Sequence, residues 1–183
     1  MNGAQAATAG ENERIHATGN ARSNAILPKV GVSSPGSLHK IAPHVRTLAF
    51  MFSDIEDSSK LWDRHPEPMR RALAVHNEVI KGGVSDHGGS IVKDRGDGFL
   101  IVFGSAGDAV AAALRLQRDL GDAAWDEPVG QLRVRLGLHS GTAEARDGDF
   151  FGPDVNRAAR LEAAAHGGQV LVSEATRALA IDG

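Results

Sequence analysis

VKDRGDGFLIVF, at residues 92–103, contains a charged turn with two glycines, and apolar residues lie on both sides of this turn. Ser90–Lys93 and Phe99–Phe103 both have strand length, and the short glycine-containing loop between them predicts a β-hairpin. A separate run, Arg46–Ser53, is continuously apolar over most of its length, which indicates burial on both faces. These runs predict a central strand and one hairpin of a sheet.

Helices and further strands surround these runs in the chain. A helix begins at Ser58 or Ser59, and Pro66 and Pro68 divide it from a second helix that weakens at Gly82. The later elements are a helix from Ser105 to Gly121, a strand over 132–138, a loop over 141–152, a helix over 154–166, a strand over 169–172 and a short helix capped by Ser173. Strand, helix, strand, strand, helix, strand is the βαββαβ order of a ferredoxin-like α+β domain, with helices packed on a sheet that contains antiparallel strands.

The composition is that of one globular domain with a polar tail. The chain has 183 residues, the length of one domain plus a tail, and 42% of them are hydrophobic, enough to form a core. Residues 1–44 are rich in Ala, Gly, Asn and Ser and show no apolar periodicity. We therefore expect a disordered tail followed by one domain at 45–183.

The same composition disfavours several classes of protein. A net charge of −3 and a pI near 6.2 give no general attraction to nucleic acid. No apolar stretch approaches the ~20 residues of a membrane span, and no signal peptide begins the chain, so we expect a soluble cytoplasmic protein. The lack of cysteine excludes disulfides and thiolate sites, and no GxxxxGK[ST] or GxGxxG motif occurs.

Two aspartates lie at the ends of predicted neighbouring strands. Asp54 follows the first apolar run, and Asp97 lies in the turn before Phe99. Either residue alone is typical of a strand end or a glycine turn. Two carboxylates at one sheet edge, however, form an all-oxygen site suited to Mg²⁺ or Mn²⁺, and paired ions ~3.5–4 Å apart recur in phosphoester chemistry.

Three further features favour a nucleoside triphosphate as the substrate. Residues 52–59 lead from a strand into a helix, so their N–H groups could hold phosphates. Asn156 and Arg160 are four residues apart and share one helix face, and Lys93 precedes Asp97 in the hairpin. Each feature also has an ordinary explanation. Residues 52–59 could simply cap a helix, Asn156 and Arg160 could form a polar helix face, and Lys93 could be a solvated strand residue. Taken together, the features indicate metal-dependent chemistry on a nucleotide.

Four segments together resemble a known family. They are FSDIEDSSKLW (52–62), VKDRGDGFLIVF (92–103), LRVRLGLHSG (132–141) and GDFFGPDVNRAARLEAAAHGGQVLVS (148–173). In this order and with these polar positions, they resemble the catalytic domain of class III nucleotidyl cyclases, in particular the bacterial adenylate cyclases. The resemblance extends from residue 45 to the end of the chain.

The resemblance implies metal ligands and a triphosphate loop. By their positions in the motifs, Asp54, Ile55 and Asp97 match the metal-binding residues, which implies two Mg²⁺ or Mn²⁺ ions per site. Ile55, Asp57 and Ser58 match the loop that contacts the triphosphate. Asp57 is a departure, because the family usually has glycine there and a carboxylate repels phosphate.

The resemblance also implies base, ribose and transition-state residues. Lys93 and Asp149 match the pair that recognises adenine, Asn156 the residue that orients the ribose, and Arg160 the residue that stabilises the transition state. A guanylate cyclase is expected to carry Glu and Cys in place of the pair, so ATP is the expected substrate. The implied reaction forms 3′,5′-cyclic AMP and pyrophosphate at sites shared across a homodimer.

The end of the sequence supplies another expectation. Family members continue through further strands and a lysine that contacts the triphosphate, whereas this sequence stops at Gly183. A C-terminally truncated domain, an uncovered sheet edge and weak activity are therefore expected. Two alternatives stay open: a catalytically weak or inactive cyclase-like module that dimerises or regulates another chain, and an unrelated ferredoxin-like binding protein.

Overall fold

The computed structural model describes residues 46–181, so the expected tail at 1–44 lies outside the described part of the chain. The elements are β1 (Leu48–Ile55), α1 (Ser58–Arg64), α2 (Pro66–Asp86), β2 (Ser90–Asp94), β3 (Gly98–Phe103), α3 (Ala106–Asp122), β4 (Val134–Gly141), β5 (Glu144–Arg146), β6 (Asp149–Phe151), α4 (Pro153–Ala164), β7 (Val170–Val172) and α5 (Glu174–Ile181). Between residues 46 and 181, no helix has the length and apolar character needed to cross a membrane.

Five strands form one sheet in the order β2-β3-β1-β4-β7. β1 pairs antiparallel with both β3 and β4, and β7 adds in parallel to β4 at the edge. The first four strands have the order expected of a βαββαβ unit, which confirms the predicted α+β fold and the central position of β1.

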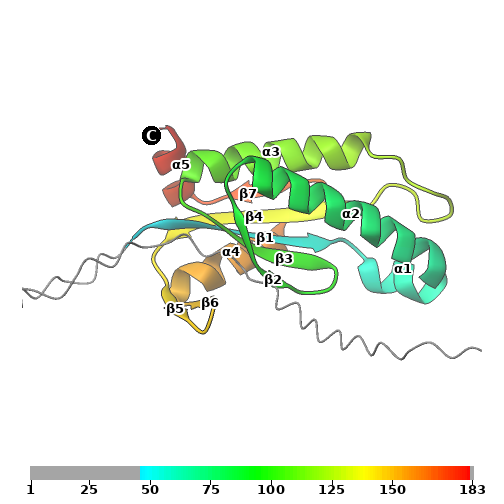
Figure 1. The fold of residues 1–183 in the computed structure, drawn as a ribbon, viewed down its shortest axis with the longest axis horizontal. Helices are drawn as coiled ribbons and strands as arrows, with labels where there is room; N and C mark the ends of the chain where they lie inside the picture. Colours follow the sequence, from blue (N-terminus) through cyan, green and yellow to red (C-terminus); the bar gives the residue numbers. More distant parts are fainter. Residues whose placement is uncertain (1–45, 182–183) are drawn as a thin grey trace, which may run out of the picture. The chain divides into compact units, whose positions relative to one another are not determined.

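Both faces of the sheet are covered. Because successive side chains of a strand point to opposite faces, Met51 joins the core under α2 and α3, whereas Phe50 and Phe52 join a second core under α4. Figure 1 shows α2, α3 and α5 on one side of the sheet, and α4 with the β5–β6 hairpin on the other. Burial on both faces explains the unbroken apolar runs of β1 and β3.

The predicted helix ends agree closely with the structure. Pro66 occupies the first turn of α2, where its missing N–H costs no hydrogen bond. The Ser105 hydroxyl accepts a hydrogen bond from the backbone N–H of Asp108, and the Ser173 hydroxyl accepts one from the N–H of Thr176. These caps satisfy N–H groups that the first turn of a helix leaves free.

The structure differs from the predicted elements at β4, at the end of β1 and in the loop before α4. β4 begins at Val134 and ends at Gly141, whereas the sequence predicts a strand over 132–138. β1 runs two residues beyond Ser53, because Ile55 N–H donates to the Asp97 carbonyl at 3.1 Å and prolongs the pairing. The predicted loop at 141–152 contains the short hairpin of β5 and β6. Its turn residues, Asp147 and Gly148, both have positive φ (53° and 79°), the backbone that an Asp-Gly hairpin turn adopts.

Candidate active site

The two aspartates meet where β1 and β3 lie unusually close. Asp54 is directly opposite Gly98, the residue after Asp97. A Cβ added to Gly98 would lie 1.9 Å from the Ser53 carbonyl oxygen, so only glycine permits this approach. The pairing therefore brings Asp97 beside Asp54 at the same end of the sheet, as the sequence predicts.

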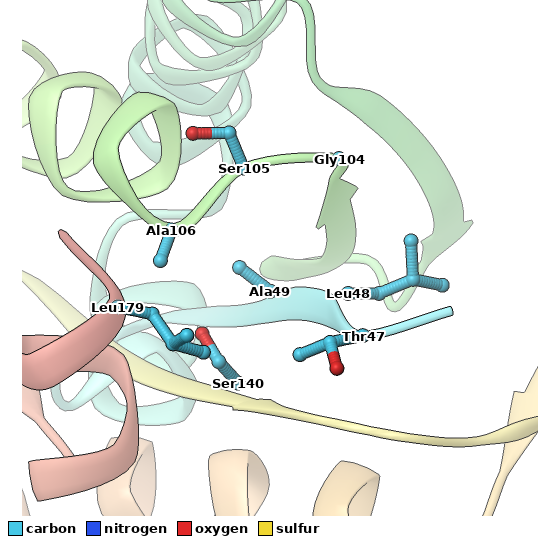
Figure 2. Close-up of a pocket in the computed structure, with 8 residues that line it drawn as sticks. All are labelled: Thr47, Leu48, Ala49, Gly104, Ser105, Ala106, Ser140 and Leu179. Carbon is cyan, nitrogen blue, oxygen red and sulfur yellow. The ribbon is translucent and has the colours of Figure 1, made fainter. Parts of the chain in front are cut away.

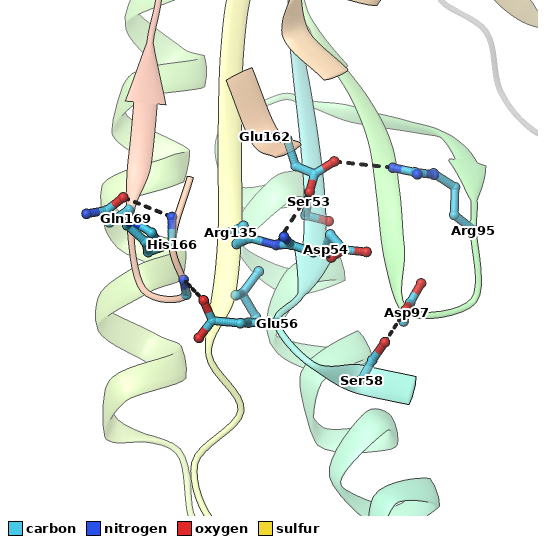
Figure 3. Close-up of polar contacts among 12 residues, drawn as sticks. Ser53, Asp54, Glu56, Ser58, Arg95, Asp97, Arg135, Glu162, His166 and Gln169 are labelled. Atoms are coloured by element: carbon cyan, nitrogen blue, oxygen red, sulfur yellow. Dashed lines mark hydrogen bonds and ion pairs between the residues drawn. The ribbon is translucent and has the colours of Figure 1, made fainter. Parts of the chain in front are cut away.

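Each of these carboxylates has a polar partner from another element. Asp54 is 17% exposed and forms an ion pair with Arg135, its cross-strand neighbour on β4. The Ser58 hydroxyl at the start of α1 donates to Asp97 Oδ2 at 2.5 Å. Figure 3 shows both contacts and their position at the end of β1. Sequence reasoning did not identify Arg135, although its alternation with the buried residues of β4 places it on the polar side of the strand.

The oxygen atoms at this end of the sheet suit a hard cation that takes the rest of its oxygen ligands from water or substrate. Within residues 46–181, no group of three His, Cys, Asp or Glu side chains is placed to hold a metal ion. Asp54 and Asp97 supply two carboxylates, while Ile55 is buried and apolar and could contribute only its carbonyl oxygen. Such a partial shell fits Mg²⁺ or Mn²⁺, which commonly complete their coordination with water and substrate phosphates.

The base-binding candidates surround a separate hollow on the α4 side of the sheet. This hollow has a volume of about 290 Å³, and the residues that line it are Phe52, Lys93, Arg95, Leu100, Asp149, Phe150, Val155, Asn156 and Ala159. Neither Asp54 nor Asp97 belongs to its lining. The apolar walls suit a planar base, and the polar groups at the rim could select among bases.

Lys93 and Asp149 face each other at that rim. Lys93 Nζ lies 3.2 Å from Asp149 Oδ2, across 56 positions of sequence. The backbone N–H of Phe150 and then Lys93 hold the pKa of Asp149 below its usual value, so this carboxylate stays ionised at neutral pH. The pair therefore presents one hydrogen-bond donor and one acceptor side by side.

Asn156 and Arg160 project from consecutive turns of α4. Both are exposed, and Asn156 lines the hollow while Arg160 lies one turn further along the helix. Within one chain the structure thus brings Lys93, Asp149 and Asn156 together, and Asp54 with Asp97 together, as two separate groups.

Asp57 occupies a position that favours glycine. Its φ of 58° and ψ of 22° are left-handed, a conformation that costs most residues ~1–2 kcal/mol, although aspartate is among those that tolerate it best. Its carboxylate lies 2.7 Å from Lys60 Nζ, and this hydrogen bond lowers the pKa of Asp57. A negative charge therefore stands in the β1–α1 loop, where phosphates are expected.

A buried acid joins the two groups of candidate residues. Glu162 of α4 has a side chain only 7% exposed, and its carboxylate oxygens lie 3.7 Å from Arg135 Nε and 3.7 Å from Arg95 Nη1. Burial, and then the charge of Asp54, raise the pKa of Glu162. The series Asp54, Arg135, Glu162 and Arg95 thus runs from the aspartate pair to the wall of the hollow.

A second hollow, of about 220 Å³, lies at the opposite end of β1 (Figure 2). Its lining consists of Thr47, Leu48, Ala49, Gly104, Ser105, Ala106, Ser140 and Leu179. None of these side chains is charged, so this hollow offers nothing to balance a triphosphate.

Comparisons with known proteins agree with this arrangement. The sequence profile of the family described as "Adenylate and Guanylate cyclase catalytic domain" matches residues 41–181. An uncharacterized protein of Mycobacterium tuberculosis is 38% identical over 136 residues, which cover 73% of this chain and 45% of that protein. The adenylate cyclase of Lachancea kluyveri is 31% identical over 158 residues, covering 73% of this chain and 9% of that protein. The chain thus spans less than half the length of these curated relatives.

Solved structures give the same result. An adenylate cyclase structure from Trypanosoma brucei, described as monomeric, has a TM-score of 0.67 and 30% identity, covering 72% of this chain and 74% of that one. An adenylate/guanylate cyclase/hydrolase from Silicibacter pomeroyi has a TM-score of 0.64 and 31% identity, covering 75% and 80%. Both similarities cover about three quarters of this chain and show the fold of a cyclase catalytic domain.

Proposed function

The chain belongs to the class III adenylate and guanylate cyclase catalytic domains, and on that premise we propose that it converts ATP to 3′,5′-cyclic AMP and pyrophosphate. The observation that carries the proposal is the placement of Asp97 beside Asp54 at the start of the β1–α1 loop, together with Lys93 and Asp149 at the rim of a base-sized hollow.

The proposed reaction is attack of the ribose 3′-oxygen on the α-phosphorus, with loss of pyrophosphate. A P–O bond forms to the 3′-oxygen, the bond to the pyrophosphate oxygen breaks, and the 3′-hydroxyl proton leaves to solvent. Asn156 would orient the ribose by hydrogen bonding, and Arg160 would offset the negative charge on the α-phosphate. When bound at Asp54 and Asp97, Mg²⁺ or Mn²⁺ supplies charge stabilisation for the entering and leaving oxygens.

The hydrogen-bond donor and acceptor at the rim of the hollow support ATP over GTP as the substrate. Adenine offers an acceptor at N1 and a donor at its N6 amine, which complement the Lys93 ammonium and the ionised Asp149 carboxylate. Guanine reverses both positions, and an unpaired or mismatched polar group costs ~1–3 kcal/mol when it is buried. A related structure supports nucleotide binding on this fold: a rhodopsin-guanylyl cyclase core with converted specificity, 25% identical, was solved with ATPαS.

The separation of the two residue groups supports a site shared between two copies of the chain. Asp54 and Asp97 lie outside the lining of the base hollow. We therefore assign the metal ligands of each site to one subunit, and Lys93, Asp149, Asn156 and Arg160 to its partner. A homodimer would hold two such sites, and we propose a cytoplasmic location because ATP is available there.

The direct test is to incubate the purified chain with ATP or GTP and Mg²⁺ or Mn²⁺ and to identify the products by chromatography. Cyclic AMP and pyrophosphate are the expected products, with ATP preferred. Asp54→Asn and Asp97→Asn should each abolish turnover, whereas Asp63→Asn, at an exposed site of α1, should retain it. Turnover that survives in both site variants would contradict the assignment of the metal ligands.

A non-catalytic dimerisation or regulatory module is the second candidate. Asp57 favours it, because this residue places an ionised carboxylate in a left-handed backbone position at the expected phosphate loop. Under this alternative, the chain would dimerise but would neither bind ATP nor form cyclic AMP with either metal ion.

A further inference from the structure

Arg135 forms a strong contact with one carboxylate and an incomplete one with another. Its guanidinium forms an ion pair with Asp54 Oδ2, an oxygen of a proposed metal ligand. Its Nε is buried and has no hydrogen-bond partner, although Glu162 Oε1 lies only 3.7 Å away. Figure 3 shows Glu162 reaching from α4 toward both Arg135 and Arg95.

A buried N–H without a partner is costly, and a small movement of the guanidinium toward Glu162 would satisfy it. A divalent cation at Asp54 would compete with Arg135 for the same carboxylate and would repel its charge. The displaced guanidinium then needs an anion within reach, and Glu162 is already 3.7 Å from it.

We propose that Glu162 is a positioning residue that controls metal binding at Asp54 by accepting Arg135 when the cation arrives. The proposal rests on the proposed function, since it concerns the same metal site. Arg95 competes for Glu162 from the other side, but it is 41% exposed and is therefore free to turn toward solvent or toward a ligand in the hollow. Through Arg95 on one side and Arg135 on the other, Glu162 thereby couples the binding of a ligand in the hollow to the position of the Arg135 charge beside Asp54.

The test is a titration of the ¹⁵N-labelled full chain with Mn²⁺ alone, following paramagnetic broadening of the amide signals near Asp54 and Asp97. Glu162→Gln keeps the size of the side chain but removes its charge, so Arg135 should stay on Asp54. The Mn²⁺ dissociation constant should rise on the order of tenfold, within the range of ordinary coupling between sites. Arg135→Ala removes the competitor and should lower the constant by a similar factor.

The double variant separates this mechanism from simple attraction of Mn²⁺ to Glu162. If Glu162 acts through Arg135, Glu162→Gln should have little effect in the Arg135→Ala background. An equal effect in both backgrounds would overturn the proposal, because the carboxylate would then act directly through space. An Arg135→Ala variant that binds Mn²⁺ no more tightly than the wild type would overturn it as well.

Glu174→Gln is the matched control, because Glu174 is an exposed acid that forms an ion pair with Arg177 on α5. It should leave the Mn²⁺ titration unchanged.

Thermal unfolding checks that each variant folds, and if Glu162→Gln does not fold, the Arg135→Ala titration still tests the competition. Shifted Mn²⁺ affinities without cyclic AMP formation would refute only the proposed function, whereas cyclic AMP formation with unshifted affinities would refute only this proposal.

Discussion

At the scale of single residues, Asp57 is where this chain departs most clearly from what the proposed phosphate loop needs. Asp57→Gly removes both the left-handed strain and the negative charge, so ATP affinity should increase several-fold, while stability should change by no more than about 1 kcal/mol. Isothermal titration with ATP and urea unfolding measure the two effects.

Asp147→Gly is the matched control, since Asp147 also has a positive φ, of 53°, but lies in the β5–β6 turn. It should change stability to a similar extent and leave ATP affinity unaltered. Equal changes in ATP affinity for the two variants would show that the charge of Asp57 does not act on phosphate.

The Lys93–Asp149 pair leads to a prediction about base preference. Lys93→Glu replaces the donor with a second carboxylate beside Asp149, so the preference for ATP should fall on the order of tenfold, equivalent to about 1.4 kcal/mol. Competition between ATP and GTP in one reaction gives the ratio of kcat/KM. Lys81→Glu, an exposed charge reversal on α2, should leave that ratio unchanged, and an unchanged ratio in Lys93→Glu would reject the role of the pair.

His76 should make the stability of the fold depend on pH. It is fully buried against Phe99, and burial holds its pKa below the ordinary value of 6.5. As the pH falls below 6.5, the unfolded chain takes up a proton that the folded chain does not, so stability decreases. The free energy of unfolding should therefore be lower at pH 5.5 than at pH 7.5.

Urea unfolding at the two pH values tests this contribution of His76. His76→Leu should reduce the pH dependence, whereas His166→Gln, at an exposed position after α4, should not. The same pH dependence in His76→Leu and the wild type would contradict the assignment.

At the scale of elements, the close contact of β1 and β3 depends on Gly98. Gly98→Ala places a methyl group against the Ser53 carbonyl, which must push the strands apart, so stability should fall by ~1–3 kcal/mol and the aspartate pair should be disturbed. Gly82→Ala is the control, because a Cβ there meets no atom within 4 Å and the position is helical. It should stabilise the chain by ~0.5–1 kcal/mol. Urea unfolding that gives the two variants the same sign would contradict this description of the sheet.

The main elements were predictable because their signals are local. The apolar runs of β1 and β3, the proline between α1 and α2, and the serine caps of α3 and α5 depend on nearby residues. The β5–β6 hairpin was missed because each strand has only three residues, too few to show an alternating pattern, although its Asp147-Gly148 turn is a recognisable signal. The end of β1 was misplaced because it depends on a hydrogen bond to the distant Asp97.

At the scale of the whole molecule, the residue types of the candidate site were predictable, whereas the contacts of Asp54 with Arg135 and of Arg135 with Glu162 were not. Asp54, Asp97, Lys93 and Asp149 stand out within motifs. The ion pair of Asp54 with Arg135 joins residues 81 positions apart, so it depends on strand register, which the sequence of either strand alone does not fix. Glu162 gave no signal because an acid in an amphipathic helix is ordinarily solvent-exposed, and only the packing of α4 on the sheet buries it.

The most direct test of the central claim is a complementation assay for cyclic AMP formation. Asp97→Asn lacks a proposed metal ligand and Arg160→Ala lacks the proposed transition-state residue, so each chain alone should be inactive. When the two are mixed and allowed to exchange subunits, each heterodimer should contain one intact site. Random exchange makes half of the dimers mixed, which predicts about a quarter of wild-type activity. A mixture that exchanges subunits, as shown by mass spectrometry, yet stays as inactive as either parent would contradict a cyclase site shared between two copies of this chain.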